Sequence, residues 1–328
     1  MLSTKKGIVI AARLCYTAFI RFTGGLSMLT DRYLMINADD FGSFACANAA
    51  IMSLLSDEKS ALTSSTVMAP APWAPQACRF AAANPDLAIG VHLTLTCEWS
   101  PVRWGPVAQG DTATLRDEEG YMWRTTEQVE KHADLAQIRQ EILAQIARCR
   151  ALGMANPSHM DNHMGSLYGI ATGRFELLET TIGIAAQMGL PFRLPASIGA
   201  HTFQNTMLGI ATDPQTTAAA ASQVVAFCRE NGVALPDHLM PGEWGGPQDE
   251  SYEAYREYLY DLYANIPAGV TETYLHPALE CDELKAAVGS WQHRVWEHRI
   301  MADPMTRQHI EAHGIRLISY RELAAMRR

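Results

Sequence analysis

The chain has 328 residues, of which 48% are hydrophobic and 19% are charged, and its mean hydropathy is −0.07. This composition excludes an intrinsically disordered chain, because disorder requires fewer apolar residues, and the length allows one large domain or two smaller ones. The net charge of −9 argues against a general affinity for nucleic acid or for an anionic membrane surface.

The first 30 residues differ in character from the rest of the chain. Two lysines precede an apolar run, as in a signal peptide, but Arg13 and Arg21 interrupt that run. A secretory signal needs roughly 7–15 uninterrupted apolar residues, and a membrane span needs roughly 20. We therefore expect residues 1–30 to be an N-terminal extension outside the core, and a single domain to cover 31–328.

Short apolar runs alternate with longer segments of helical spacing in the rest of the chain. The clearest helix is 134–152, where isoleucines recur at helical spacing and Gly153 follows as a stop signal. Strands are predicted at 33–38, 62–68, 88–95, 157–161, 191–195, 236–240, 271–277 and 315–319. Helices are predicted at 45–56, 74–83, 134–152, 174–189, 217–231, 251–264 and 305–313.

This alternation of strands and helices determines the predicted fold class. Repeated strand–helix–strand units predict a parallel sheet with right-handed crossovers. About eight such units in roughly 250–300 residues is the size of a (β/α) barrel, so we predict a barrel of about seven or eight parallel strands. A doubly wound open sheet is the alternative, but the sequence has no G-x-G-x-x-G after its first strand.

Two adjacent carboxylates, Asp39 and Asp40, end the first predicted strand in the run NADDFG. In a (β/α) barrel the active site is built at the carboxyl ends of the strands. Two aspartates at that place could divide the chemistry, since one can hold a cation while the other takes a proton from a water molecule. An ordinary turn that caps the next helix explains the same residues equally well.

Histidines mark two further strand ends. His92 shares its face of the strand 88–95 with small residues, which leaves room for a site. His159, Asp161 and His163 share one face if the chain there is extended, and converging imidazoles and carboxylates suit a metal site. The alternatives are a histidine satisfied within the core for His92 and a polar loop for 159–163.

His276 follows another strand, and two loops carry tryptophans. The imidazole could protonate a leaving group, because its unperturbed pKa lies near neutrality, although a structural capping role is equally compatible. Tryptophans beside charged groups in loops could stack on sugar rings, but such tryptophans more often pack against their own domain. The loop residues considered for substrate binding are Glu98, Trp99, Arg103, Trp104 and Trp244.

Four motifs occur in order along the chain, namely NADDFG at 37–42, GVHLTLT at 90–96, SHMDNHMG at 158–165 and LHP at 275–277. Together they resemble the YdjC family of carbohydrate deacetylases, with its ChbG-like and HpnK-type members. The resemblance implies an irregular (β/α) barrel related to those of polysaccharide deacetylases and glycoside hydrolases. The chitooligosaccharide deacetylases continue the third motif with further histidines that this chain lacks, so specificity for chitobiose is not implied.

The resemblance also implies a role for each candidate residue. In the family, one aspartate and two histidines bind a divalent metal ion, and they correspond here to Asp40, His92 and His163. Asp39 corresponds to the general base and His276 to the general acid. The supporting residues around the metal would be His159 and Asp161.

These roles imply a hydrolase that removes an acetyl group from an N-acetylated sugar or oligosaccharide, with a metal-bound water activated by Asp39. One carboxylate and two imidazoles suit zinc or magnesium, and manganese, cobalt and nickel are alternatives. The same ligand set occurs in non-haem iron oxygenases, which usually fold as all-β double-sheet barrels. A non-catalytic carbohydrate-binding protein on the same scaffold is the third hypothesis.

The expected partner is a small-molecule or oligosaccharide substrate, without nucleic acid and without a membrane, and a homodimer is left open. The seven cysteines are scattered and form no C-x-x-C pair, which is typical of proteins from a reducing compartment. We therefore expect a cytoplasmic protein, although residues 1–30 leave export open.

Overall fold

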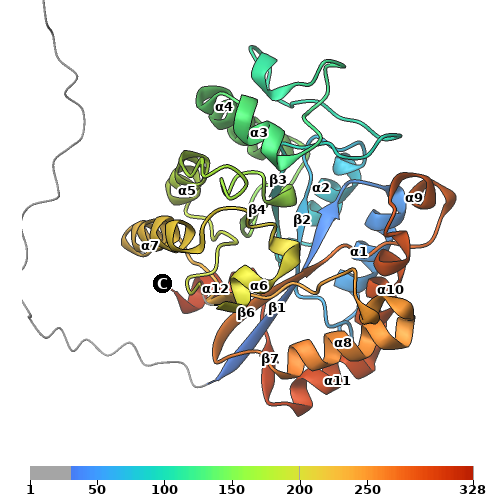
Figure 1. Cartoon of the computed structure of the whole chain (residues 1–328). Coiled ribbons are helices and arrows are strands. Elements are labelled where there is room, and N and C mark those ends of the chain that lie inside the picture. Colours follow the sequence, from blue (N-terminus) through green and yellow to red (C-terminus); the bar gives the residue numbers. More distant parts are fainter. Residues whose placement is uncertain (1–30, 199, 328) are drawn as a thin grey trace, which may run out of the picture.

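Parallel strands form the centre of the molecule in the computed structural model, which describes residues 31–198 and 200–327 (Figure 1). The order of the strands across the sheet is β4-β3-β2-β1-β6-β5, and β7 pairs with the first half of β1. The expected extension at residues 1–30 lies outside the described residues. The strands are β1 (Arg32–Phe41), β2 (Ser64–Val67), β3 (Ile89–Leu93), β4 (Met160–Asn162), β5 (His238–Leu239), β6 (Gly269–Leu275) and β7 (Ile315–Leu317).

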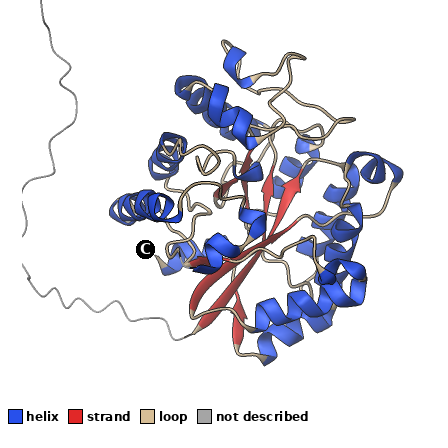
Figure 2. Ribbon diagram, in the orientation of Figure 1, coloured by secondary structure: helices blue, strands red, loops and turns tan. Residues whose placement is uncertain are grey.

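Helices surround these strands on the outside of the molecule, as the blue ribbons around the red arrows in Figure 2 show. Each of the predicted helices is present, with ends shifted by at most three residues. The helices of the described part are α1 (Ala45–Ser56), α2 (Ala74–Ala83), α3 (Thr126–His132), α4 (Leu135–Ala151), α5 (Glu176–Met188), α6 (Ala200–Gln204), α7 (Pro214–Glu230), α8 (Tyr252–Ala264), α9 (Asp282–Ala287), α10 (Trp291–Ala302), α11 (Pro304–Ala312) and α12 (Tyr320–Met326).

The predicted strand 191–195 is an irregular segment that bridges the opening between β4 and β5. Arg193 N–H donates to the Met160 carbonyl on one side at 3.1 Å, and Phe192 N–H donates to the Ala234 carbonyl on the other at 3.1 Å. Pro191 and Pro195 lack an N–H group, so the segment cannot continue a regular ladder. These bonds complete the curled parallel sheet, and the predicted (β/α) barrel is confirmed in its irregular form.

Helix α10 is the longest helix that the sequence pattern did not predict. Two of the side chains that it buries are Arg294 and Glu297, which stand at positions where an amphipathic helix normally carries apolar residues. Charged residues on the inner face break the apolar periodicity by which a helix is recognised. Arg294 lines the candidate pocket described below, and Glu297 accepts a hydrogen bond from the backbone N–H of His276, which lines it too.

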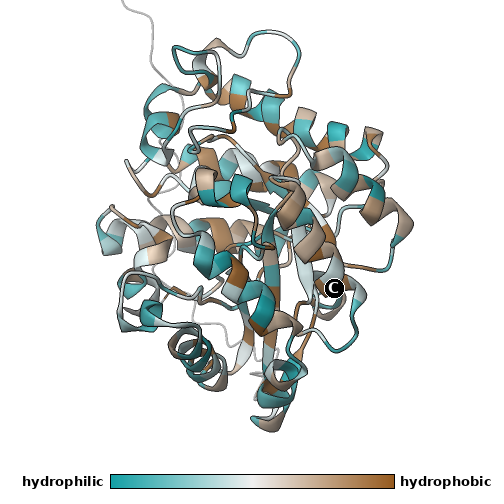
Figure 3. Cartoon of the chain, turned by 90° about the vertical axis from the view of Figure 1, so that its right-hand side faces the viewer, coloured by the Kyte–Doolittle hydropathy of each residue, from teal (hydrophilic) through white to brown (hydrophobic). Residues whose placement is uncertain are grey.

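The apolar core lies between the strands and the inner faces of the helices. Helix α4, for example, buries Ile138, Ile142 and Ile146 at helical spacing. Hydrophilic and hydrophobic residues accordingly alternate along the outer helices in Figure 3. Within the described residues, no helix combines the length and the apolar character that crossing a membrane requires.

Candidate active site

Polar side chains from several strand ends meet in one pocket of about 1020 Å³. The ends of β1, β3, β4 and β6 contribute to it, as expected when parallel strands place their carboxyl ends at one edge. The lining includes Arg193 and Arg294, neither of which the sequence motifs predict as a site residue. The predicted residues that line the pocket are Asp39, Asp40, His92, Glu98, His163, Trp244 and His276.

The local structure of β1 explains how the two aspartates reach this pocket. The pairing of β1 with β2 shifts register between Ala38 and Phe41, and Asp40 has a left-handed backbone with φ of +62°. Such irregularities turn side chains that a regular strand would direct elsewhere. Gly42 follows with φ of +100°, and a Cβ atom there would lie 3.0 Å from the Ala74 Cα, so the turn requires glycine.

Asp40, His92 and His163 form a buried group suited to a cation. Their potential ligand atoms all lie within 4.8 Å of one another. The Asp40 Oδ1 atom is 3.6 Å from His92 Nε2 and 3.3 Å from His163 Nδ1. One carboxylate oxygen and two imidazole nitrogens around a common point are a donor set that divalent metal ions accept.

The Asp40 carboxylate itself indicates a missing partner. Neither of its oxygens accepts a well-oriented hydrogen bond from the described residues, although Arg294 Nη1 lies 2.8 Å from Oδ2. Burial would raise the pKa of Asp40, but Arg294 and His163 lower it well below its usual range. A buried, ionised and incompletely bonded carboxylate beside two histidines fits a metal ligand.

A carboxylate behind each histidine sets the orientation of the ring. The Asp161 Oδ1 atom lies 2.7 Å from His92 Nδ1, and the Glu98 Oε2 atom lies 3.0 Å from His163 Nε2. Burial would lower the pKa of both histidines, but these carboxylates, with Asp39 at His92 and Asp40 at His163, raise it. The pocket therefore stabilises positive charge, whether a proton or a metal ion carries it.

Arg193 holds Asp39 firmly. The guanidinium donates to both oxygens of Asp39 at 2.7 Å, and it also contacts Asp161 at 2.9 Å and Glu272 at 2.8 Å. A second group with metal-binding geometry, Asp39, His92 and Asp161, has both of its carboxylates bound to this arginine. The group at Asp40 is therefore the better candidate for a cation, because Arg294 approaches only Oδ2 and the two histidines face Oδ1. The sequence signal for Arg193 is a charged residue inside an apolar predicted strand.

His276 lies at the same pocket with a neutral imidazole. Burial lowers its pKa to about 4, although Asp40 has the opposite effect. Its backbone N–H donates to Glu297 Oε2 at 2.7 Å, and its ring packs edge-on against Trp244 at 5.9 Å. The ring Nδ1 atom is buried and has no hydrogen-bond partner within the described chain.

Four other predicted residues have different surroundings. Trp99 and Trp104 are buried and pack edge-on at 5.4 Å, and Arg103 pairs with Asp117, so these three side chains do not line the pocket. His159 also lies outside the pocket lining, where it stacks on Tyr320 at 3.6 Å. Each of these side chains is engaged by the protein's own packing.

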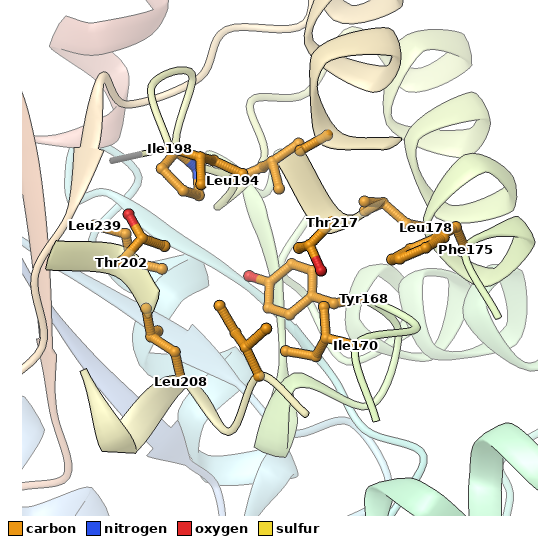
Figure 4. Close-up of a pocket in the computed structure, with 13 residues that line it drawn as sticks. Tyr168, Ile170, Phe175, Leu178, Leu194, Ile198, Thr202, Leu208, Thr217 and Leu239 are labelled. Atoms are coloured by element: carbon orange, nitrogen blue, oxygen red, sulfur yellow. The ribbon is translucent and has the colours of Figure 1, made fainter. Parts of the chain in front are cut away.

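An apolar pocket of about 530 Å³ adjoins the candidate site (Figure 4). Tyr168, Leu208 and Leu239 line both pockets. The Tyr168 hydroxyl donates to the Arg193 carbonyl at 2.7 Å, which fixes this ring between the two cavities. The lining of the apolar pocket includes no charged side chain.

Known proteins match nearly the whole of the described chain. A family model described as YdjC-like protein matches residues 33–312. Proteins named carbohydrate deacetylase from Geobacillus stearothermophilus and Enterococcus faecalis are each 27% identical, over 89% and 90% of this chain and 98% and 100% of their own lengths. A crystal structure of an Enterococcus faecalis protein superposes with a TM-score of 0.68 at 26% identity, covering 89% of this chain and 99% of that one. The matched region includes every residue of the candidate site.

Proposed function

Because this chain belongs to the YdjC-like family, we propose that it is a metal-dependent carbohydrate deacetylase that hydrolyses the amide of an N-acetylated sugar. Relatives named carbohydrate deacetylase align over about nine-tenths of the chain. The observation that carries the proposal is the buried group of Asp40, His92 and His163 beside a second carboxylate, Asp39. Amide hydrolysis needs a polarised carbonyl and a base for water, and this pocket offers groups for both.

The cation would be held by Asp40, by His92 through Nε2 and by His163 through Nδ1. When bound, such a cation polarises the amide carbonyl and lowers the pKa of a water molecule. Two imidazoles and one carboxylate favour zinc, while manganese, cobalt and nickel accept the same donors and magnesium prefers more oxygen ligands. We therefore propose zinc as the native ion and magnesium as the first alternative to test.

Asp39 would take the proton from the attacking water. Arg193 binds both of its carboxylate oxygens, which fixes the direction of the carboxylate. Asn37 Nδ2 donates to Asp39 Oδ1 at 2.8 Å and limits its rotation further. A base held in one orientation can accept a proton without reorganising during the reaction.

His276 would protonate the departing amine, which leaves readily only when protonated. The ring begins the reaction neutral, because burial lowers its pKa to about 4. The proton that Asp39 takes from the attacking water is therefore the one that His276 would pass on to the amine nitrogen as the C–N bond breaks. Arg294 faces the same pocket and holds Asp40 Oδ2, so it limits the movement of the carboxylate that we assign to the cation.

Trp244 would contact the sugar ring. Its indole lines the pocket, stacks on His293 at 5.2 Å and donates from Nε1 to the Tyr255 hydroxyl at 3.2 Å. A fixed aromatic surface of this kind is suited to the apolar face of a sugar. We do not extend this role to Trp99, Arg103 or Trp104, whose side chains are outside the pocket lining.

The other two functions considered from the sequence are less well supported. Non-haem iron oxygenases with two histidines and one carboxylate usually have all-β folds, whereas this chain has parallel strands and surrounding helices. A non-catalytic descendant of a deacetylase would be expected to have lost a metal ligand, and Asp40, His92 and His163 are all present.

The experiment that tests the proposal measures acetate release from a panel of N-acetylated mono- and disaccharides, with the metal content determined in the same samples. Asp39→Asn should abolish acetate release and keep the metal, whereas Asp40→Asn should lose the metal. If Asp39→Asn loses the metal instead, the roles of the two aspartates are reversed. Absence of release with zinc, manganese, cobalt and magnesium alike would refute the deacetylase assignment.

A further inference from the structure

We infer that Glu98 is a positioning residue, whose carboxylate holds His163 Nε2 so that His163 Nδ1 faces Asp40, and that it thereby sets the affinity of the site for a divalent cation. The inference rests on the proposed function for the identity of the site. It assigns Glu98 to the support of a metal ligand rather than to the substrate. The evidence for this role is the pair of contacts that the His163 ring makes with Glu98 on one side and Asp40 on the other.

The His163 ring is held between two carboxylates. Both oxygens of Glu98 approach Nε2, at 3.0 and 3.2 Å, while Nδ1 lies 3.3 Å from Asp40 Oδ1. A neutral imidazole carries one N–H, and a carboxylate that only accepts hydrogen bonds retains that hydrogen on the nitrogen facing it. Glu98 therefore leaves the lone pair of His163 on Nδ1, directed at the position of the cation.

His92 shows the same principle with the opposite nitrogen. Its Nδ1 atom lies 2.7 Å from Asp161, and its Nε2 atom faces Asp40. A carboxylate behind a histidine ligand fixes the ring and raises its basicity. Asp161 also binds Arg193 and Thr66, whereas His163 is the only side chain that hydrogen-bonds to the Glu98 carboxylate in the part of the chain that is described. Glu98 is thus dedicated to one ring.

The backbone around Glu98 keeps the carboxylate in place. Cys97 N–H donates to the Trp123 carbonyl at 2.7 Å, and Trp104 Nε1 donates to the Thr96 carbonyl at 3.0 Å. The Trp99 ring lies 6.2 Å from His163 and edge-on to it. The Trp104 ring lies 6.5 Å from His163, so both tryptophans of this loop pack beside the ring that Glu98 contacts.

The test measures the binding of zinc and of cobalt(II) to the full chain, by competition with a chromophoric chelator after the metal has been removed. Glu98→Ala should weaken cation binding by about 10- to 100-fold, the range found when the outer partner of a histidine ligand is lost. Glu98→Gln should retain most of the affinity, because its amide oxygen still accepts from Nε2. The visible spectrum of bound cobalt(II) should change in Glu98→Ala and be largely restored in Glu98→Gln.

Glu119→Ala is the matched control, because Glu119 is an exposed carboxylate near the same loop, paired with Arg103 at 3.2 Å. It should leave cation affinity and the cobalt spectrum unchanged. If Glu98→Ala binds both cations as tightly as the native chain and raises only the KM for sugar, Glu98 contacts substrate and the inference is overturned. The binding assay contains no sugar, so a chain that binds the cations in a Glu98-dependent way but releases no acetate would refute the proposed function alone.

Discussion

Arg193→Met should destabilise the fold strongly, because it leaves three buried carboxyl groups without the guanidinium that they share. Arg193 is 3% exposed and lies within 2.9 Å of Asp39, Asp161 and Glu272. Removing one partner of a buried ion pair typically reduces stability by about 3–5 kcal/mol. Burial raises the pKa of Glu272 to about 7, so this group takes up a proton readily, whereas Asp39 and Asp161 each lose the arginine that pairs with them.

This loss of stability can be converted to a shift in melting temperature. Unfolding entropy is about 2.1 cal/mol/K per residue, which gives roughly 0.6 kcal/mol/K for a domain of about 300 residues. A loss of about 3–5 kcal/mol therefore lowers the Tm by about 5–8 °C. Arg193→Lys keeps a positive charge but cannot bridge three carboxylates, so its Tm should lie between those of the native chain and of Arg193→Met.

Differential scanning calorimetry at pH 7.5 on the metal-free protein separates this effect from any change in cation binding. A Tm for Arg193→Met within about 1 °C of the native value would refute the reasoning. It would mean that the buried carboxyl groups are neutralised without the arginine.

Two further predictions concern Glu297 of helix α10 and Trp244, which we propose to contact the sugar. Burial raises the pKa of Glu297 to about 7 from an ordinary value of 4.5. The protonated group therefore contributes its full stability to the fold below about pH 4.5, and this contribution is lost as the pH rises to 7. The Tm of Glu297→Gln minus the Tm of the native chain should therefore increase between pH 5 and pH 8. A Tm difference that does not change with pH would contradict this reasoning. Trp244→Ala should raise the KM for the sugar about 5- to 10-fold, as expected for losing an aromatic contact, with kcat and metal content little changed. A loss of metal in Trp244→Ala would argue that the indole supports the cation site instead.

Much of the fold can be predicted because the strands and outer helices follow local rules. Periodicity and stop signals are enough to predict the apolar run that ends in Asp39 and Asp40, the helix at 134–152 and the alternation of strands and helices. The parallel arrangement then implies that strand ends far apart in sequence meet at one edge. That single inference is enough to bring Asp40, His92, His163 and His276 to a common pocket.

The arginines and the acidic partners cannot be predicted in the same way. Arg294 reaches Asp40 from the first turn of α10, and no motif marks a contact that depends on how this helix packs against the barrel. Glu98 is identified from the sequence as a site residue, but its partner depends on the path of a long loop. Arg193 lies between two prolines in a segment whose irregular backbone directs it at three carboxylates. Contacts of this kind are determined by tertiary packing.

The left-handed backbone of Asp40 restricts which amino acids an evolving chain can place there. A residue other than glycine, asparagine or aspartate in this conformation costs roughly 1–2 kcal/mol, whatever its side chain contacts. Asp40→Ala therefore combines a backbone penalty with the loss of the ligand, while Asp40→Asn loses the negative charge that the cation needs but keeps a side chain that tolerates this backbone. A lineage that abandoned the metal centre but kept the fold would be expected to carry asparagine or glycine at this position, which makes such descendants identifiable from sequence alone.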